Sequence, residues 1–404
     1  MIRVRRVILG ALVLATLMVA VGGCSSGGDD HDSGIQFTGA EPVETTEPSD
    51  LAGCGEVADD DAARDCYAEA LSALFEGEDD PSSALEEAAV AAYSDPTGRL
   101  LGDCHGLMHT VGREFAAEHD VTLASLMTFL PQSNEPGCTA GFAHGLVTGV
   151  APQIDLSRPA EAAAVCDETD TRYQRYSCIH GFGHAFMRLV REDLDAALQL
   201  CAALGDVNAP DCSQGAFHDY WFAVIGADDT EPPEEVADDP RELCGAQDPQ
   251  FVRPCWYRAF VDDRPDQPVD GVEAIEALCT GLEGLQRQAC ITAASVVGPP
   301  DPSSQLAICT DFEGEDAVSC IRGTKVQNLL ATAAPEDLVA LIRQCDGFPG
   351  ATRLACYRWL GKVLAVLTDG AFEDFGCGSL PDAPARRACV EGVRSMNGAL
   401  ETFS

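Results

Sequence analysis

The chain has 404 residues, and its 66 acidic and 25 basic residues give a formal net charge of −41. A surface this acidic repels nucleic acid and anionic lipid and concentrates cations, so the composition argues against a nucleic-acid partner. Adaptation to a high-salt habitat would explain the same bias.

Residues 1–23 have the pattern of a secretory signal peptide. Arginines at positions 3, 5 and 6 precede an apolar run over residues 7–21, and Gly22 and Gly23 supply the small residues of a cleavage site. The sequence Val21-Gly22-Gly23-Cys24 resembles the lipobox of bacterial lipoproteins. That resemblance implies cleavage before Cys24 and a diacylglyceryl group on its sulfur. The protein would then be held at the membrane by this lipid, in the cell envelope outside the cytoplasm. The alternatives are a plain secreted protein and a single uncleaved helix.

Residues 24–51 are rich in Ser, Gly, Asp, Glu, Thr and Pro, with few large apolar side chains. Such a segment cannot bury a core, so we expect a disordered tether. No later apolar run approaches the roughly 20 residues that span a bilayer. The remaining residues suffice for two ordinary domains or one long repeat array.

The cysteines predict a disulfide framework. There are 19, and assigning Cys24 to the lipid leaves an even number in an exported chain, where disulfides persist. Most fall in neighbouring pairs 11 or 12 residues apart, which favours pairing within each neighbourhood, and the remaining two are paired by elimination. The predicted pairs are Cys54 with Cys66, Cys104 with Cys138, Cys166 with Cys178, Cys201 with Cys212, Cys244 with Cys255, Cys279 with Cys290, Cys309 with Cys320, Cys345 with Cys356, and Cys377 with Cys389.

From residue 178 onward, the second cysteine of each pair recurs every 30 to 43 residues, the period of helical-hairpin repeats. In each unit a first helix begins near Pro or Asp and ends near the first cysteine, and a second, apolar helix opens around the second. Alternating β-branched runs are scarce. We therefore predict an all-α fold of disulfide-clipped helical hairpins, forming a solenoid or an α/α toroid. This layout is similar to that of the cysteine-rich Sel1-like repeat proteins, but their glycine signature is absent and no functional residue is carried over.

The histidines divide the array into three parts. We expect His-bearing helical repeats over residues 52–225, an acidic Pro-rich linker over residues 226–240, and helical repeats without histidine over residues 241–404. The division suggests that the chemistry of the protein is concentrated in the first set of repeats.

Six histidines follow the cysteines that open successive second helices. Two pairs are spaced i, i+4, which places both rings of a pair on one helix face. Because equivalent positions of a solenoid line one surface, we expect all six to converge as a transition-metal site for Cu, Zn or Fe, with one ion or two ions of three ligands each. The six are His105, His109, His144, His180, His184 and His218.

This arrangement resembles that of the coupled binuclear copper proteins and, more loosely, helical zinc sites. No Glu lies between the paired histidines, so the general base of the zincin motif is missing. Asp103, Glu114 and Asp219 are candidates to orient the histidines or to ligate iron. Non-covalent haem held by two histidines is a further possibility.

A structural role for the histidines is the competing interpretation. Glycines near them would let helices approach closely, and the histidines would then bond neighbouring carbonyl groups in a packing and capping motif. These glycines are Gly106, Gly141, Gly181 and Gly215.

Basic residues occupy related positions in the later repeats. They would form an inward lining for a carboxylate or phosphate, or pair with local acids on the surface. The candidates are Arg322, Lys325, Arg358 and Lys362, with Arg258 and Arg394 at similar positions.

The sequence shows no nucleophile constellation, P-loop or dinucleotide fingerprint. The leading hypothesis is an extracytoplasmic, lipid-anchored protein that binds a transition metal for metal capture or redox chemistry, with a metal-dependent oxidoreductase as one possibility. The alternative is a non-enzymatic scaffold that binds another envelope protein.

Overall fold

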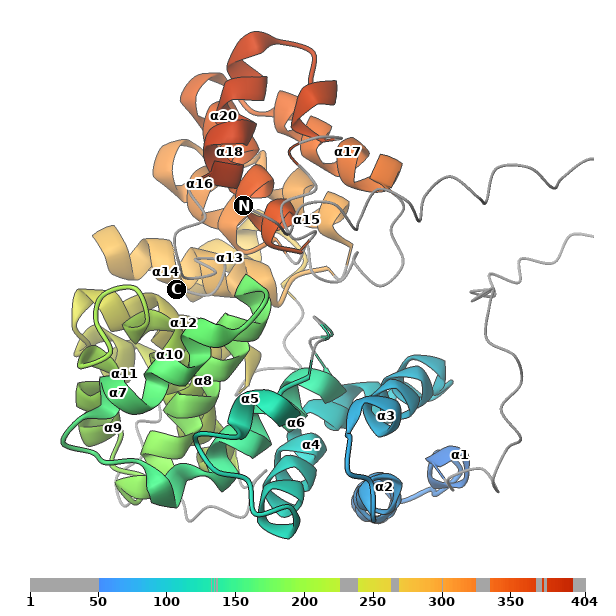
Figure 1. The fold of residues 1–404 in the computed structure, drawn as a ribbon. Helices are drawn as coiled ribbons and strands as arrows, with labels where there is room; N and C mark the ends of the chain where they lie inside the picture. Colours follow the sequence, from blue (N-terminus) through green and yellow to red (C-terminus); the bar gives the residue numbers. More distant parts are fainter. Residues whose placement is uncertain are drawn as a thin grey trace, which may run out of the picture. The chain divides into compact units, whose positions relative to one another are not determined.

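The computed structural model describes residues 51–131, 133, 135, 137–225, 239–262, 269–299, 301–324, 335–367, 373 and 376–394, all within one compact unit, Ser49–Ser404. The predicted signal peptide with Cys24, nearly all of the tether, most of the predicted linker and Lys325 lie outside these residues. The described residues form helices and no strand, which confirms the all-α fold (Figure 1). None of their helices combines the length and apolar character needed to cross a bilayer.

Short and long helices alternate along the chain. The odd-numbered helices precede the cysteine-bearing even-numbered ones. The odd-numbered helices are α1 (Leu51–Cys54), α3 (Ser82–Ser94), α5 (Leu126–Phe129), α7 (Pro159–Ala163), α9 (Leu194–Ala202), α11 (Pro240–Gly245), α13 (Val272–Leu278), α15 (Pro302–Cys309) and α17 (Pro335–Arg343). The even-numbered helices are α2 (Asp60–Phe75), α4 (Arg99–Glu118), α6 (Cys138–Gly149), α8 (Arg172–Leu189), α10 (Ala209–Ile225), α12 (Pro249–Val261), α14 (Gly284–Val296), α16 (Gly314–Arg322), α18 (Gly350–Leu367) and α20 (Ala383–Arg394). Short 3-10 turns are η1 (Ala151–Gln153), η2 (Ala164–Glu168), η4 (Gln344–Gly347) and η5 (Cys377–Ser379).

Local signals set several helix starts. Pro159, Pro240 and Pro302 occupy the first turn of α7, α11 and α15, where their missing N–H is not needed. Asp193 caps α9 by accepting from the backbone N–H of Ala196. Thr171 forms a reciprocal capping box with Gln174 at the start of α8, the helix that carries two of the candidate histidines.

Nine disulfides join the pairs that the cysteine spacing predicts, with Cα atoms 5.0 to 5.7 Å apart. The bonds link Cys54 with Cys66, Cys104 with Cys138, Cys166 with Cys178, Cys201 with Cys212, Cys244 with Cys255, Cys279 with Cys290, Cys309 with Cys320, Cys345 with Cys356, and Cys377 with Cys389. The pair assigned by elimination differs from the others, because it joins two long helices, α4 and α6.

The second cysteine of most pairs lies inside its helix and does not open it, which corrects the expected helix starts. The helix begins six residues earlier in seven repeats, so the cysteine sits in the second turn, and in α10 it begins three residues earlier. The reason is that caps and first-turn signals set a helix start, as Asp59 does for α2 and Pro249 for α12, whereas a disulfide needs only the correct distance. The seven second-turn cysteines are Cys66, Cys178, Cys255, Cys290, Cys320, Cys356 and Cys389.

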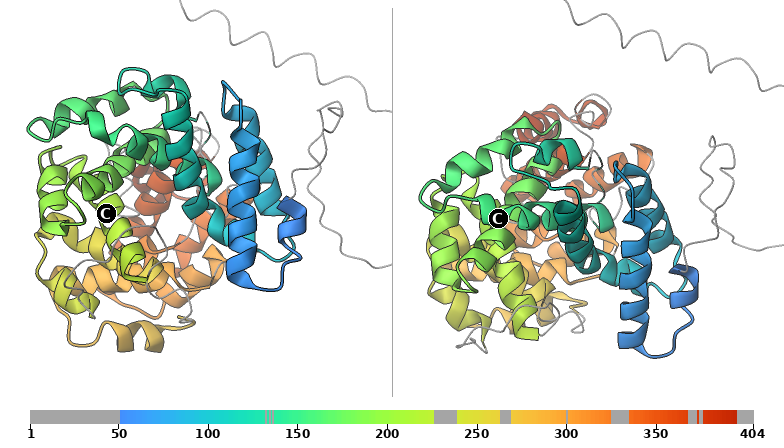
Figure 2. Two further views of the ribbon diagram at one scale, coloured as in Figure 1. Left: turned by 90° about the horizontal axis from the view of Figure 1, so that it is seen from below. Right: turned by 60° about the horizontal axis from the view of Figure 1, so that its bottom comes forward.

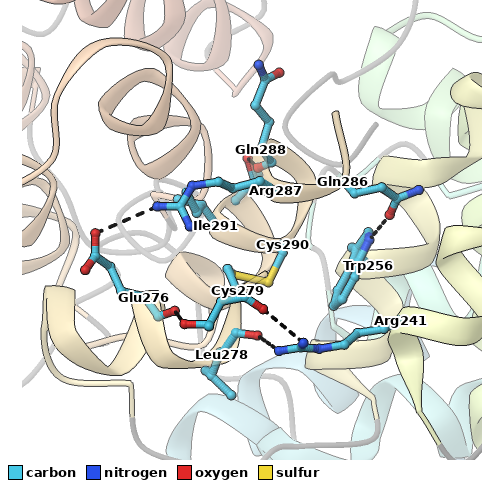
Figure 3. The surroundings of a disulfide bond; sticks show 12 residues. Arg241, Trp256, Glu276, Leu278, Cys279, Gln286, Arg287, Gln288, Cys290 and Ile291 are labelled. Carbon is cyan, nitrogen blue, oxygen red and sulfur yellow. Dashed lines mark hydrogen bonds and ion pairs between the residues drawn. A yellow bond between two sulfur atoms is a disulfide. The ribbon is translucent and has the colours of Figure 1, made fainter. Parts of the chain in front are cut away.

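Most disulfides therefore clip the end of a short helix to the second turn of the following long one. The Cys279–Cys290 bond does so between α13 and α14 (Figure 3). The side chain of Arg241 on α11 donates to the Leu278 carbonyl at 2.7 Å, so the preceding hairpin is also tied to this one.

The long helices pack in chain order, from α4 against α6 through to α18 against α20. This succession can be followed in Figures 1 and 2. The contacts are not confined to chain neighbours, because α18 also contacts α8. Residues from the C-terminal repeats are therefore brought to the helices that carry the histidines.

Candidate metal centre

The six candidate histidines lie together on four consecutive long helices, α4, α6, α8 and α10. Their ring centroids are separated by 4.5 to 5.9 Å in the contacting pairs. His144 and His218 each contact rings of both i, i+4 pairs. All are buried except His105, which is half-buried. We call these six residues the histidine cluster.

Glycines make this convergence possible. A Cβ atom on Gly141 of α6 would lie 2.1 Å from the carbonyl oxygen of His105, and one on Gly215 of α10 would lie 2.0 Å from that of His180. Real side chains cannot occupy such positions, so α6 approaches α4, and α10 approaches α8, more closely than any other residue would allow. Two of the four glycines singled out in the sequence thus act through helix contact, which places the rings of neighbouring helices side by side.

The first group of ring nitrogens is compact. The Nε2 atom of His109 lies 3.3 Å from Nε2 of His105 and 3.2 Å from Nδ1 of His144. Nitrogens bound to one tetrahedral ion at about 2.0–2.1 Å are about 3.3 Å apart. His109 is therefore spaced from each of the other two rings as ligands of a single ion would be, and one ligand atom from each of the three lies within 4.8 Å of the others.

A second group uses the pair on α8. One ligand atom from each of His144, His180 and His184 lies within 4.8 Å of the others. The Nδ1 atom of His184 is 2.5 Å from Oδ1 of Asp219 on α10, with both residues buried. A carboxylate in this position orients a metal-binding ring and raises its basicity. The two groups share His144. Two separate sets of three ligands therefore require His218 to be the third ligand of one set.

The outward hydrogen bonds fix which nitrogens face the interior. His105 Nδ1 lies 3.2 Å from the Gly137 carbonyl oxygen, and His184 Nδ1 lies 2.5 Å from the carboxylate oxygen Oδ1 of Asp219. Both partners only accept hydrogen bonds, so in the neutral rings Nδ1 carries the proton and Nε2 carries a lone pair. The Nε2 atom of His184 is buried and meets no hydrogen-bond partner in the part of the chain that the structure describes. The cluster therefore contains at least one inward ring nitrogen that a metal ion could bind without displacing a hydrogen bond.

Electrostatics favour the neutral form of four of the six rings. Burial is the largest cause that lowers the pKa of His109, His144, His180 and His218 well below its ordinary value. The proximity of other rings of the cluster lowers the pKa of each further, because two cationic imidazoles repel. Neutral imidazole is the form that binds a transition metal.

Of the three carboxylates predicted to support the site, only Asp219 faces it. Asp103 lies two residues before His105, on the opposite side of α4. Its pKa is raised chiefly by burial, and the nearby charges of Arg64 and Asp60 place it towards α2. Glu114 is exposed and accepts a hydrogen bond from Ser72 of α2 at 3.2 Å. The structure therefore does not bring these two residues to the histidines, because the helix directs them towards α2.

The basic residues of the later repeats separate into two kinds. Arg358 is exposed and pairs with Glu391 at 2.9 Å, which is the surface pairing that the sequence left open. Arg322 is half-buried, and Lys325 lies outside the described residues. By contrast, Lys362 of α18 is buried, and its charge acts on the buried Asp211 of α10.

Arg258 of α12 is also buried, and it reaches the cluster. Its Nη2 atom is 3.4 Å from Nε2 of His180. The C-terminal repeats, which carry no histidine, thus contribute a charged side chain to the surroundings of the cluster.

Sequence reasoning missed several polar neighbours of the rings. The Ser177 hydroxyl lies 3.1 Å from Nε2 of His144, and the Tyr176 hydroxyl lies 3.4 Å from Nδ1 of His180 while donating to Gln214 at 2.9 Å. Ser177 and Tyr176 precede Cys178 on the helix that carries the second i, i+4 pair. Their spacing of about one helical turn from His180 was the sequence signal that could have placed them beside the cluster. His119, outside the cluster, stacks on Phe115 with centroids 4.1 Å apart.

Comparisons with known proteins identify no relative of this chain: no protein-family model, no curated protein and no solved structure matches it.

Proposed function

We propose that the histidine cluster binds a transition metal, for metal capture or for redox chemistry. The observation that carries the proposal is the convergence of six imidazoles, with ring nitrogens 3.2–3.3 Å apart in one group and a buried His184 Nε2 atom that has no hydrogen-bond partner among the described residues. A structural packing motif would match each inward acceptor with a donor, because unpaired buried polar atoms cost about 1–3 kcal/mol each. A cation supplies the missing partner.

The donor set favours copper or zinc. Imidazole suits Cu, Zn, Fe and Ni, whereas the common non-haem iron sites add a carboxylate ligand. Within the described residues, the carboxylate bonded to the cluster is Asp219, and it touches Nδ1 of His184 and thus serves as an outer partner. Two i, i+4 pairs, each within contact of both His144 and His218, support two ions with three imidazoles each. When bound, the metal would supply Lewis acidity or one-electron chemistry.

The direct test is metal content. Mature protein produced in an oxidising compartment should take up one or two equivalents of Cu or Zn, measured by elemental analysis after dialysis. Because burial holds the pKa of four of the rings well below its usual value, protons compete weakly, and bound metal should be retained as the pH falls through 6.5. A protein that binds neither metal would instead support structural histidines and the scaffold alternative.

We further propose that the protein is held in the cell envelope by a lipid on Cys24. The support is the lipobox-like sequence together with nine disulfides, which persist in oxidising compartments. In bacteria fed a labelled fatty acid, the wild-type protein should become labelled and Cys24→Ala should not, because it lacks the thiol that is alkylated. Equal labelling of the two proteins would contradict the lipid anchor.

A further inference from the structure

A buried arginine lies at the edge of the histidine cluster. Arg258 is 8% exposed, and its guanidinium has one hydrogen-bonded carboxylate, Asp262, at a long 3.3 Å. Its Nη2 atom points to Nε2 of His180 at 3.4 Å. The buried Nε atom has no hydrogen-bond partner anywhere in the described ranges. The guanidinium therefore retains donor capacity on the side of the cluster.

The charge of Arg258 acts directly on the candidate ligands. After burial, which is the largest cause, this charge is among those that lower the pKa of His144, His180 and His218. An arginine cannot lose its proton under these conditions, so a metal cation beside it would be repelled. A site that keeps both a guanidinium and a metal needs negative charge between them.

The buried carboxylates supply only part of that charge. Asp219 is engaged with His184, and Asp262 accepts from Nη1 of Arg258, one helical turn along α12. A divalent ion together with the guanidinium carries more positive charge than these two carboxylates balance, and two ions increase the excess. In a buried pocket such an excess is costly, and a bound anion would offset it.

We propose that Arg258 anchors a small oxyanion or carboxylate that occupies an open coordination position of the metal beside His180. This inference rests on the proposed metal site. The planar fork of arginine donates two parallel hydrogen bonds to two oxygens of one anion, which gives both affinity and orientation. Formate and bicarbonate are small anions that present such a pair of oxygens. Arg258 is thus a ligand-positioning residue contributed by a repeat that carries no histidine.

The test uses full-length mature protein loaded with Cu²⁺. Azide is titrated and followed by its ligand-to-copper absorption band, and formate is then titrated as a competitor. Arg258→Gln should weaken azide binding at least tenfold while the copper content stays at the wild-type value. Arg258→Lys keeps the charge but loses the fork, so it should weaken formate binding more than azide binding. Arg253→Gln is the matched control, since Arg253 lies on the same helix with its Nη2 atom near Gln288, at 3.5 Å, and it should bind azide like the wild type.

The outcomes separate this inference from the metal site itself. Wild-type protein that takes up neither copper nor zinc would overturn both proposals. Copper-loaded Arg258→Gln with azide affinity within twofold of the wild type would overturn the anion anchor alone. If Arg258→Gln fails to fold or to load copper, the Arg258→Lys variant decides the question. A bidentate role for Arg258 is contradicted if this variant loses azide and formate affinity equally, or loses neither.

Discussion

Replacing His180 and His184 together by Ala should abolish tight metal binding. His180 and His184 are two of the four histidines that form the i, i+4 pairs of α4 and α8. Asp219 contacts and orients His184. Losing two nitrogen ligands of one ion should weaken its affinity at least 100-fold. Metal at 100 times its dissociation constant stabilises a protein by about 2.7 kcal/mol, so the variant should also lose the metal-dependent part of its thermal stability.

The helix itself should survive the change, because Ala is the best helix former. The replacement nevertheless leaves Asp219 as a buried carboxylate without its ring partner, which lowers the stability of the metal-free protein. His180→Gln with His184→Gln is therefore the matched variant, since an amide keeps a hydrogen-bond donor and much of the volume. It should also lose metal binding while keeping more of the metal-free stability.

The measurement is a competition titration with a chelator of known affinity, together with thermal unfolding with and without metal. His31→Ala, which changes a histidine of the predicted tether, is the control and should behave like the wild type. If both double variants retained wild-type affinity, the cluster could not be the metal site, and any bound metal would have to be sought elsewhere in the chain.

Much of the fold could be predicted because its signals are local. A disulfide that clips a helical hairpin requires cysteines at a nearly fixed separation, so the spacing of Cys201 and Cys212 already indicates their bond. The histidines follow the cysteines at similar spacings in successive repeats, so their position on one helix predicts their position on the next. For that reason six rings from four helices were expected to converge, and the structure brings them together.

The errors arise where orientation or tertiary contact decides. Asp103 is close to His105 in sequence, but two residues correspond to about 200° around a helix, and this rotation sends its carboxyl towards α2. In the sequence, Arg258 is only one of several basic residues that recur at related positions after the cysteines. Its contact with His180, 78 residues earlier in the chain, depends on how α12 packs on α10 beside the cluster, which no local pattern encodes.

The glycine contacts lead to the second large expected effect. Gly215→Ala should destabilise the protein and weaken its metal binding at the same time. The new Cβ atom would lie 2.0 Å from the His180 carbonyl oxygen, and the nearest atoms are backbone, so no side-chain rotation can relieve the clash. The helices α8 and α10 must separate, at a cost of about 3 kcal/mol for overpacking of this kind.

Separation of these helices acts on the metal site directly. His180 and His184 lie on α8, whereas His218 and Asp219 lie on α10, so the 2.5 Å contact between His184 and Asp219 spans the junction that opens. Metal affinity should therefore fall in Gly215→Ala although no ligand has been removed. A glycine that served only as a flexible helix residue would give the opposite result, because Ala in a helix is favoured over Gly by about 1 kcal/mol.

Gly102→Ala provides the matched control. Gly102 lies in α4, another helix that carries two histidines, and a Cβ atom there would meet nothing within 4 Å in the described structure. This variant should be as stable as the wild type or more stable by up to about 1 kcal/mol, with unchanged metal affinity. Urea unfolding of the metal-free, disulfide-intact proteins and a chelator competition on the same samples give both quantities. Equal stability of Gly215→Ala and Gly102→Ala would show that α8 and α10 do not approach as closely as the histidine cluster requires.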